Sequence, residues 1–312
     1  MNTIPKLNLG IAAYNSQANI KHLLASVLVQ KQEKFILEKI IVHSDASTDD
    51  TIAKIQTVKD PRIIIIDRKE RGGFANAVKI ILGSSNSDLT ILLNDDIIIE
   101  DSDFLNKAIE SFYTNDKLGL ASVSAEPLAS TNFIESAGVS AFRVYNRVFS
   151  KVNNGRNVYT CDGKVLILSK NFKDGLKFPE DVARMGCVDS YLYFLCMSKD
   201  FEYAYVNNIR VFYKCPGTVA DYISWTLRNT AERAILEKEF PVIAKKDFSI
   251  PLGKFMISIL RELVLNPFGI VFLVCSNFYI KFKLLFGRSA NGHLWDTVAT
   301  TKSIKINYNE KY

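Results

Sequence analysis

The 312-residue sequence predicts an α/β protein with a mostly parallel, Rossmann-like sheet that is covered by helices on both faces. In the first third of the chain, short apolar runs alternate with segments of helical periodicity. Repeated strand–helix units of this kind give parallel neighbouring strands with helices packed on the sheet. The predicted strands are residues 6–13, 36–43, 62–67 and 89–94, and the predicted helices are residues 20–28, 51–58 and 74–82.

Local signals set the boundaries of these elements. Ser16 follows the first strand and is a good helix N-cap. After the second strand, Ser47 or Thr48 can cap the next helix, and Asp49 and Asp50 favour its first turn. The second half is less regular, with a polar, loop-like stretch expected over residues 146–162. We expect a buried helix at 188–197, strands near 203–206 and 211–213, and a long amphipathic helix at 218–240.

Composition limits the class of protein. The sequence is 48% hydrophobic, which is ample for a buried core. Its five cysteines are scattered without a close CxxC pair, so we expect free thiols in a reducing compartment and no zinc site. The first ten residues lack the basic and apolar regions of a signal peptide. Residues 251–312 carry eight Lys or Arg against three Asp or Glu, so a nucleic-acid partner, which needs basic residues across a working face, is not expected.

The C-terminal part contains an apolar stretch, residues 255–286, that is broken by charges, Asn266 and Pro267. Its longest uncharged piece, residues 263–280, is borderline for a spanning helix, which needs roughly 20 apolar residues. Three interpretations stay open. Interrupted apolar helices beside basic residues are typical of segments that lie in a membrane interface. The alternatives are a buried packing or dimer helix pair, and a true membrane span.

Two adjacent carboxylates, Asp95 and Asp96, stand at the end of the apolar run 89–93, directly after Asn94. Such a run is typical of a strand buried on both faces, and an unpaired buried charge costs several kcal/mol. These acids therefore need a cation or a water-filled cleft, and a hard metal ion that carries a phosphate suits them. The alternative is that the doublet only begins a surface turn.

Polar features follow all four predicted strands, at the edge where open α/β sheets bind ligands. The chain here resembles the inverting nucleotide-sugar glycosyltransferases of family 2, which have the GT-A fold. The resemblance covers roughly residues 5–235 and rests on four segments together. They are Ala13-Tyr14-Asn15, Ser44-Asp45-Ala46-Ser47-Thr48-Asp49, Arg71-Gly72-Gly73-Phe74-Ala75-Asn76 and Asn94-Asp95-Asp96.

The resemblance implies a set of residues that bind the nucleotide-sugar. Ala13 and Tyr14 are expected to contact the base and ribose. Asp45 is expected to accept a hydrogen bond from the base imide, which favours uracil or thymine. Arg71 is expected to approach the base or diphosphate, and Asp95 the ribose and sugar.

The resemblance also implies that Asp96 holds a divalent ion, Mg²⁺ or Mn²⁺, on the diphosphate. Some relatives add a histidine after the last strand as a further ligand. Here Tyr213-Lys214 occupies that stretch, and His293 is far away in the sequence. Asp96 is then the only firm protein ligand, which Mg²⁺ tolerates because it keeps waters and substrate phosphates as ligands.

Residues 178–195 resemble the helix that carries the catalytic base in this family. Asp189 takes the place of the catalytic aspartate, and Glu180 and Asp181 are second choices. The alternative for Asp189 is a helix cap. On the following helix, Arg228 is expected to approach the leaving diphosphate or else to anchor the helix.

The resemblance predicts single-step inverting transfer of one sugar from a UDP- or dTDP-linked donor. The acceptor is a hydroxyl of a glycan or a polyprenyl-linked glycan in cell-surface polysaccharide synthesis. The processive Gln-x-x-Arg-Trp motif is reduced to Arg228, so polymer synthesis is not expected. A nucleotidyltransferase, which normally has a Gly-rich loop after its first strand, and a non-catalytic nucleotide-binding module are the alternatives.

These expectations define the organisation of the whole chain. Residues 1–240 form the catalytic domain, with a donor part (1–125) and an acceptor and base part (126–240). Residues 241–312 form a basic, apolar helical extension. Because anionic lipid attracts Lys and Arg, we expect a cytoplasmic protein that is peripherally associated with the inner face of the membrane, and a homo-oligomer is possible.

Overall fold

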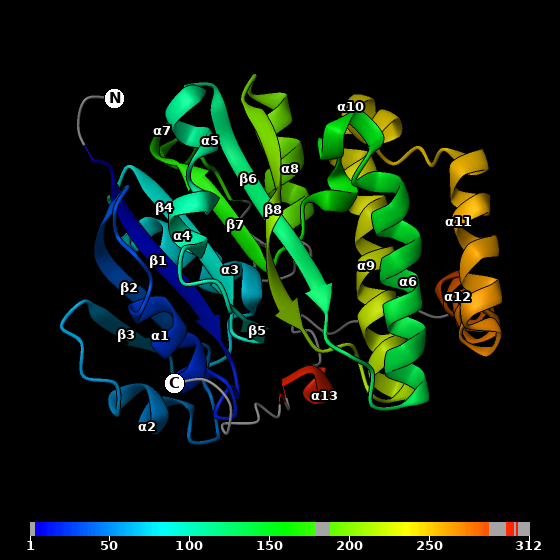
Figure 1. Cartoon of the computed structure of the whole chain (residues 1–312), viewed down its shortest axis with the longest axis horizontal. Helices are drawn as coiled ribbons and strands as arrows, with labels where there is room; N and C mark the ends of the chain where they lie inside the picture. The colour runs from blue at the N-terminus through cyan, green and yellow to red at the C-terminus, as the bar shows by residue number, and fades with distance from the viewer. Residues whose placement is uncertain (1–3, 179–187, 287–297, 303, 305–312) are drawn as a thin grey trace.

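The computed structural model describes residues 4–178, 188–286, 298–302 and 304. One sheet of eight strands runs through it in the order β3-β2-β1-β4-β7-β6-β8-β5 (Figure 1). The strands are β1 (Lys6–Ala13), β2 (Ile36–Ser44), β3 (Ile63–Asp67), β4 (Leu89–Asn94), β5 (Ile97–Ile98), β6 (Leu118–Pro127), β7 (Val165–Ser169) and β8 (Glu202–Tyr213).

The four strands that the sequence predicts form a parallel half of the sheet. β1 pairs with β2 on one side and β4 on the other, and β3 pairs with β2, all in parallel. β7 is antiparallel to both β4 and β6, whereas β6 and β8 run parallel to each other. The predicted α/β class with a mostly parallel sheet is therefore confirmed, with antiparallel strands in the other half.

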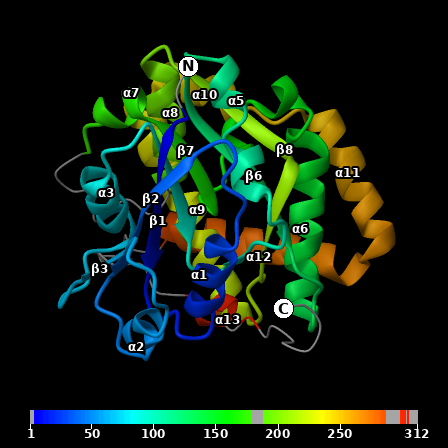
Figure 2. The same cartoon turned by 60° about the vertical axis from the view of Figure 1, so that its left-hand side comes forward.

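Helices cover both faces of the sheet, as Figure 2 shows. Alternate residues of one strand enter different cores, as Ile40 and Ile41 of β2 do. Helix α1 (Ile20–Leu28) packs in the first core with α2 (Thr51–Gln56) and α4 (Phe104–Ala108). The second core contains α3 (Phe74–Ser84) and α8 (Val188–Ser198).

The second half of the chain departs from the sequence expectations in two places. The expected loop at 146–162 is wrong at its start, because α6 (Phe133–Phe149) continues through Phe149 before two short 3₁₀ turns, η1 (Val152–Gly155) and η2 (Val158–Thr160). The two strands expected near 203–206 and 211–213 are one strand, β8. Its pairing with β6 shifts between Val206 and Arg210, so extra residues are taken up there as a bulge.

Helices α6 and α9 (Val219–Glu239) form a layer beside the sheet, and the C-terminal helices pack against it (Figure 1). Helix α11 (Leu252–Leu265) is joined to α6 by the fully buried Glu262, which accepts a hydrogen bond from Arg147. Helix α12 (Pro267–Phe286) packs on α6 and α9. The remaining helices are α5 (Ser111–Thr114), α7 (Lys170–Asp174), α10 (Pro241–Asp247) and α13 (Ala299–Lys302).

The outer faces of α11 and α12 are apolar and exposed. Val264 is 83% exposed, and Phe268 and Phe278 are exposed by 76% and 73%. Among the described residues, one helix, α12, has the length and the apolar composition that crossing a membrane requires. One side of this helix pair packs on α6 and α9, and much of the other side is exposed apolar surface, so the three interpretations of this stretch stay predictions.

Candidate functional site

The sheet register brings the predicted donor residues to one edge. Ala13 of β1 pairs with Ser44 of β2, and Ala12 pairs with Asn94 of β4. The residues that follow these positions, among them Asp45 and the aspartate doublet, therefore leave the sheet side by side at its carboxyl edge.

Asp45 is held in a nest of backbone amides. Its two carboxylate oxygens accept the N–H groups of Gly72 at 2.7 Å and Gly73 at 2.9 Å. Gly73 has a φ of 83°, a conformation that side chains other than glycine rarely adopt, and the turn depends on it. The Arg71 guanidinium lies 3.7 Å from Asp45 and 3.9 Å from the centroid of the Tyr14 ring.

Ala13 has a different surrounding from the other predicted donor residues. Its side chain is 2% exposed and belongs to the core. Its carbonyl oxygen accepts the N–H of Asp45 at 2.9 Å. In this structure Ala13 therefore positions Asp45 through the backbone.

Asp95 is buried, and one of its two carboxylate oxygens accepts three hydrogen bonds. Its Oδ2 accepts the N–H of Tyr14 at 3.0 Å and the hydroxyl of Ser16. The same oxygen accepts from the Lys302 ammonium at 2.6 Å. Lys302 belongs to α13 and also donates to the Tyr14 carbonyl, so a segment far away in the sequence reaches the predicted donor residues.

Asp96 forms a buried ion pair with Lys164, which directly precedes β7. The Lys164 ammonium lies 2.8 and 3.0 Å from the two carboxylate oxygens. Burial works to raise the pKa of Asp96, but the Lys164 ammonium, together with the charge of Lys302 and a hydrogen bond from Thr301, outweighs burial and holds this pKa below its usual value. Burial opposes the charge of Lys164 too, yet Asp96 and Asp162 raise the pKa of Lys164. Both partners are therefore ionised at neutral pH.

The donor set around the doublet does not suit a divalent ion as it stands. Both oxygens of Asp96 already accept from Lys164, and Oδ2 of Asp95 accepts from Lys302. The ring of Tyr213, where the resemblance leads one to look for a histidine, lies 5.2 Å from the Lys164 ammonium. In the ranges that the structure describes, no group of three His, Cys, Asp or Glu gathers as a ligand set. The predicted Mg²⁺ or Mn²⁺ site at Asp96 stays a prediction.

Asp189 lies in the first turn of α8, and its carboxylate is fixed by two backbone amides. Oδ2 accepts the N–H of Gly163 at 3.0 Å, and Oδ1 accepts the N–H of Ser190 at 2.8 Å. Burial and the neighbouring Asp162 raise the pKa of Asp189 to about 6, against the opposing effect of these bonds and of Arg228. A carboxylate with this pKa is ionised at neutral pH and is basic enough to accept a proton. The second choices, Glu180 and Asp181, lie outside the described residues.

Arg228 of α9 is close enough to Asp189 to lower its pKa. Its Nε is buried and has no hydrogen-bond partner among the described residues, and the same holds for Oδ1 of Asn94 beside the doublet. Buried polar atoms without partners are costly, so such atoms point to a ligand. The ligand best suited to a free guanidinium N–H is an anionic oxygen.

Sequence reasoning missed three charged residues of this site, Asp162, Lys164 and Lys302. For the first two a signal exists, because Asp162-Gly163-Lys164 is a turn that leads directly into the apolar run of β7. For Lys302 no local pattern indicates a contact with residues at the other end of the chain.

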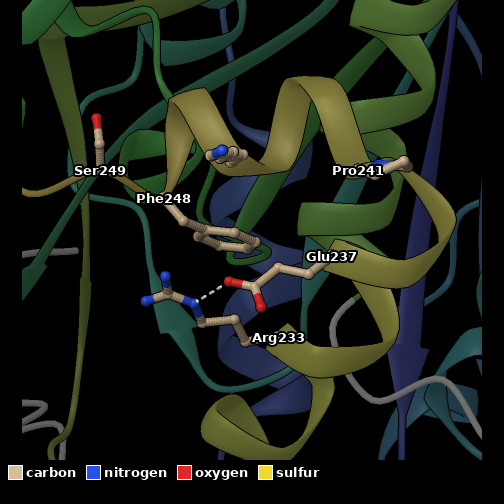
Figure 3. Close-up of a pocket in the computed structure, with 6 residues that line it drawn as sticks. Arg233, Glu237, Pro241, Phe248 and Ser249 are labelled. Atoms are coloured by element: carbon tan, nitrogen blue, oxygen red, sulfur yellow. Dashed lines mark hydrogen bonds and ion pairs between the residues drawn. The ribbon is translucent and has the colours of Figure 1, made fainter.

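A separate pocket lies between α9 and α10 (Figure 3). Arg233 donates to Glu237 there at 2.7 Å, and its guanidinium lies 4.6 Å from the Phe248 ring centroid. None of the predicted site residues lines it, so it plays no part in the arguments below.

Residues 9–170, a little over half of the chain, match the family model described as glycosyl transferase family 2. The chain belongs to glycosyltransferase family 2. No curated protein matches the chain. The family 2 assignment confirms the resemblance seen in the sequence and makes the protein a nucleotide-sugar glycosyltransferase.

Solved structures agree on the fold of this family 2 protein. A mannosyltransferase from Pyrobaculum calidifontis, in complex with GDP-Man and Mn²⁺, has a TM-score of 0.56 at 16% identity, covering 92% of this chain and 77% of that one. A glucosyl-3-phosphoglycerate synthase from Mycobacterium tuberculosis, in complex with Mn²⁺, UDP and phosphoglyceric acid, has a TM-score of 0.52 at 15% identity, covering 75% and 78%. At these identities the likeness establishes the GT-A fold.

Proposed function

We propose that the protein moves one sugar, with inversion, from a UDP- or dTDP-linked donor to a hydroxyl of a glycan or lipid-linked acceptor. The observation that carries the proposal is the geometry of Asp189. Its carboxylate has a pKa raised to about 6 and is fixed by Gly163, which leads into the strand beside the doublet. A base of this kind, next to the residues that are expected to bind the nucleotide-sugar, is what inverting transfer needs.

Each bond change in the proposed step has an assigned group. Asp189 takes the proton of the acceptor hydroxyl, and the acceptor oxygen attacks the anomeric carbon from the face opposite the leaving group. The bond from that carbon to the diphosphate oxygen breaks, and its electron pair leaves with the nucleoside diphosphate. Arg228 offers a donor to the developing charge, since its Nε has no described partner.

The donor lies across the sheet edge in this proposal. The base stacks beside Tyr14, whose ring already contacts the Arg71 guanidinium. Asp45 faces the base and accepts from its imide N–H, because a carboxylate oxygen has lone pairs to spare beyond the bonds from Gly72 and Gly73. Asp95 lies near the ribose and sugar. This arrangement favours uracil or thymine, although the two solved neighbours hold a guanine and a uracil nucleotide.

Besides Arg228, a divalent ion on Asp96 is a second candidate for the positive charge that would stabilise the departing nucleoside diphosphate. The neighbours of known structure contain Mn²⁺, and that favours it. In this chain such an ion reaches Asp96 only if the Lys164 ammonium gives up its two contacts.

The acceptor is proposed to be presented at a membrane surface, as for a polyprenyl-linked glycan in cell-surface polysaccharide synthesis. The exposed apolar faces of α11 and α12, together with the exposed Lys281 and Lys283, support peripheral binding to an anionic inner leaflet. The same faces could also be covered by a second copy of the chain in a homo-oligomer.

A donor screen tests the proposal. Thermal shifts are measured with UDP-, dTDP- and GDP-sugars, each with and without Mg²⁺ or Mn²⁺. We expect a uracil or thymine nucleotide-sugar to raise the melting temperature of the wild type. The wild type should also release the nucleoside diphosphate from that donor, either without a metal ion or with one. The Asp189→Asn variant should still be stabilised by the donor. Binding without any release would instead support a non-catalytic nucleotide-binding module.

A further inference from the structure

Both carboxylates of the doublet are already paired with lysines. Lys164 spans the two oxygens of Asp96, and Lys302 lies 2.6 Å from Asp95. Both ammonium groups are mostly buried, with side-chain exposures of 17% and 20%. Two full positive charges thus occupy the place where the family resemblance puts a divalent ion.

Lys302 reaches this place because α13 is fixed on the acceptor side of the molecule. The Thr300 N–H donates to Asp221 at 3.1 Å, and the Gly217 N–H donates to the Thr300 hydroxyl at 2.9 Å. Asp221 belongs to the first turn of α9, so residues 298–302 connect that helix with the donor edge of the sheet. In Figure 1, α13 lies below the lower ends of β5 and β8.

The charges here distinguish two roles for Lys302. Among the described residues of this cluster, the three carboxylates of Asp95, Asp96 and Asp162 lie beside the two ammonium groups of Lys164 and Lys302, so carboxylates are in excess. A diphosphate adds further negative charge, and like charges a few ångströms apart repel strongly in a buried site. If Lys302 left when the donor arrived, the repulsion would grow. The charges therefore favour a lysine that stays and binds the diphosphate over one that only blocks the site.

We propose that Lys164 and Lys302 together replace the divalent ion in this chain, an inference that rests on the proposed glycosyl transfer. Lys164 neutralises Asp96 from inside the protein. Lys302, carried by residues 298–302, donates hydrogen bonds to the diphosphate and to the oxygen that receives the electron pair when the anomeric bond breaks. Donor binding and transfer then proceed without a metal ion, and residues 298–302 close the donor site.

The experiment measures the affinity of the full chain for UDP and dTDP by calorimetry, in EDTA and in Mg²⁺ or Mn²⁺, together with transfer rates. We expect the wild type to bind with the same affinity, within about twofold, in all conditions. Lys302→Met should weaken nucleotide binding by about tenfold to a hundredfold, the effect of removing a charged hydrogen-bond donor. Lys302→Arg should recover most of the affinity because it keeps the charge and the donors.

Two comparisons make the result specific. Lys69→Met removes an equally charged side chain that is 88% exposed and pairs with Asp67 away from the site, and it should leave the affinity unchanged. Lys164→Met removes the ammonium group that pairs with the buried Asp96. Its nucleotide affinity is compared only for samples whose circular dichroism spectrum matches that of the wild type. In those samples we expect that binding in EDTA falls and that added Mn²⁺ restores it, because an ion can then take the place of the ammonium.

Three outcomes overturn the inference. If EDTA abolishes wild-type binding and Mn²⁺ restores it, the lysines do not replace the ion, while the proposed function stands. If Lys302→Met binds the nucleotide more tightly than the wild type, residues 298–302 block the site. If Lys302→Met equals the wild type, Lys302 has no role in donor binding. If no donor is turned over, with or without a metal ion, the proposed function is contradicted. The nucleotide affinities decide the role of Lys302 in that case as well.

Discussion

Gly163 donates its backbone N–H to Oδ2 of Asp189 over 3.0 Å. Gly163 lies in the turn before β7. The backbone carbonyl of the next residue, Lys164, accepts the N–H of Asn94 at the end of β4. A Cβ on Gly163 would lie 3.2 Å from the same carboxylate oxygen, so glycine permits this close approach. One short turn thereby fixes the proposed base next to the aspartate doublet.

Replacing Asp189 by Asn should lower kcat by about 10²- to 10⁴-fold, the usual contribution of a general base. Asn keeps the size of the side chain and can keep one of the two N–H bonds from Gly163 and Ser190. Because Asp189 does not contact the nucleotide in the proposed step, the affinity for the nucleotide should change by less than about threefold. Rates are measured as release of nucleoside diphosphate and affinity by calorimetry. Loss of nucleotide binding would show that Asp189 supports the structure of the site instead.

The pH profile of transfer should report the raised pKa of Asp189. The active form is the ionised carboxylate, and its pKa lies at about 6. The value of kcat/KM should therefore be constant above about pH 7 and fall tenfold per unit as the pH drops below about 6. A profile that stays flat down to about pH 4.5, near the usual pKa of an aspartate, would contradict the assignment.

Replacing Asp45 by Asn should loosen the turn at Gly72 and Gly73. The amide offers one acceptor oxygen where the carboxylate offers two, so one of the two N–H bonds is lost. An unsatisfied buried N–H costs about 1–3 kcal/mol, which denaturant unfolding should detect together with weaker binding of UDP or dTDP. Asp67→Asn, at a surface ion pair, is the control and should be neutral on both measures.

The ion pair that joins α6 and α11 should matter for stability. Arg147→Met leaves the fully buried Glu262 with Arg143 at 4.0 Å as its remaining described cation, and we expect a loss of about 3–5 kcal/mol in the free energy of unfolding. The double variant Arg147→Met, Glu262→Leu should recover most of it. Lys34→Met breaks an exposed pair with Glu110 and should cost under about 1 kcal/mol.

Flotation with vesicles tests the membrane proposal. Lys281→Glu with Lys283→Glu reverses two exposed charges beside the apolar face of α12, and binding to anionic vesicles should fall by at least about tenfold. The control pair Lys59→Glu, Lys69→Glu carries the same change of net charge on another exposed part of the surface. Equal flotation of both pairs would remove the proposed role of α12, and a concentration-dependent mass would favour a homo-oligomer.

The parallel half of the sheet could be predicted well because its strands are short runs rich in apolar residues that alternate with helical segments. The predicted and observed bounds of β1 and β4 coincide, and those of β2 differ by one residue. Helix α6 was missed because small and aromatic residues obscure its period, and its packing against α11 and α12 stabilises it. Its start had a readable signal, since Asn132 accepts the Glu135 N–H as an N-cap.

The part of the candidate site that could be predicted from the residues themselves is the part that follows the strands, whereas Asp189 and Arg228, which lie on helices, came from the family resemblance. Asp45 and the doublet were found because they follow strands, and the structure brings them to one edge. The proposed division into a catalytic domain and a C-terminal extension stays a prediction. Lys302 contacts Tyr14 across a separation of 288 residues, and such a contact depends on the finished tertiary structure.

This separation has a practical consequence for anyone who prepares the protein. Contacts between distant parts of a chain pay the largest loop-closure entropy and form slowly. The few residues of α13 add almost nothing to the helix signal or to the buried core. A sample can therefore melt cooperatively and look native by every bulk spectroscopic measure while α13 is not in place and the proposed donor site lacks Lys302. Batch quality is better judged by ligand titration than by any global probe of folding.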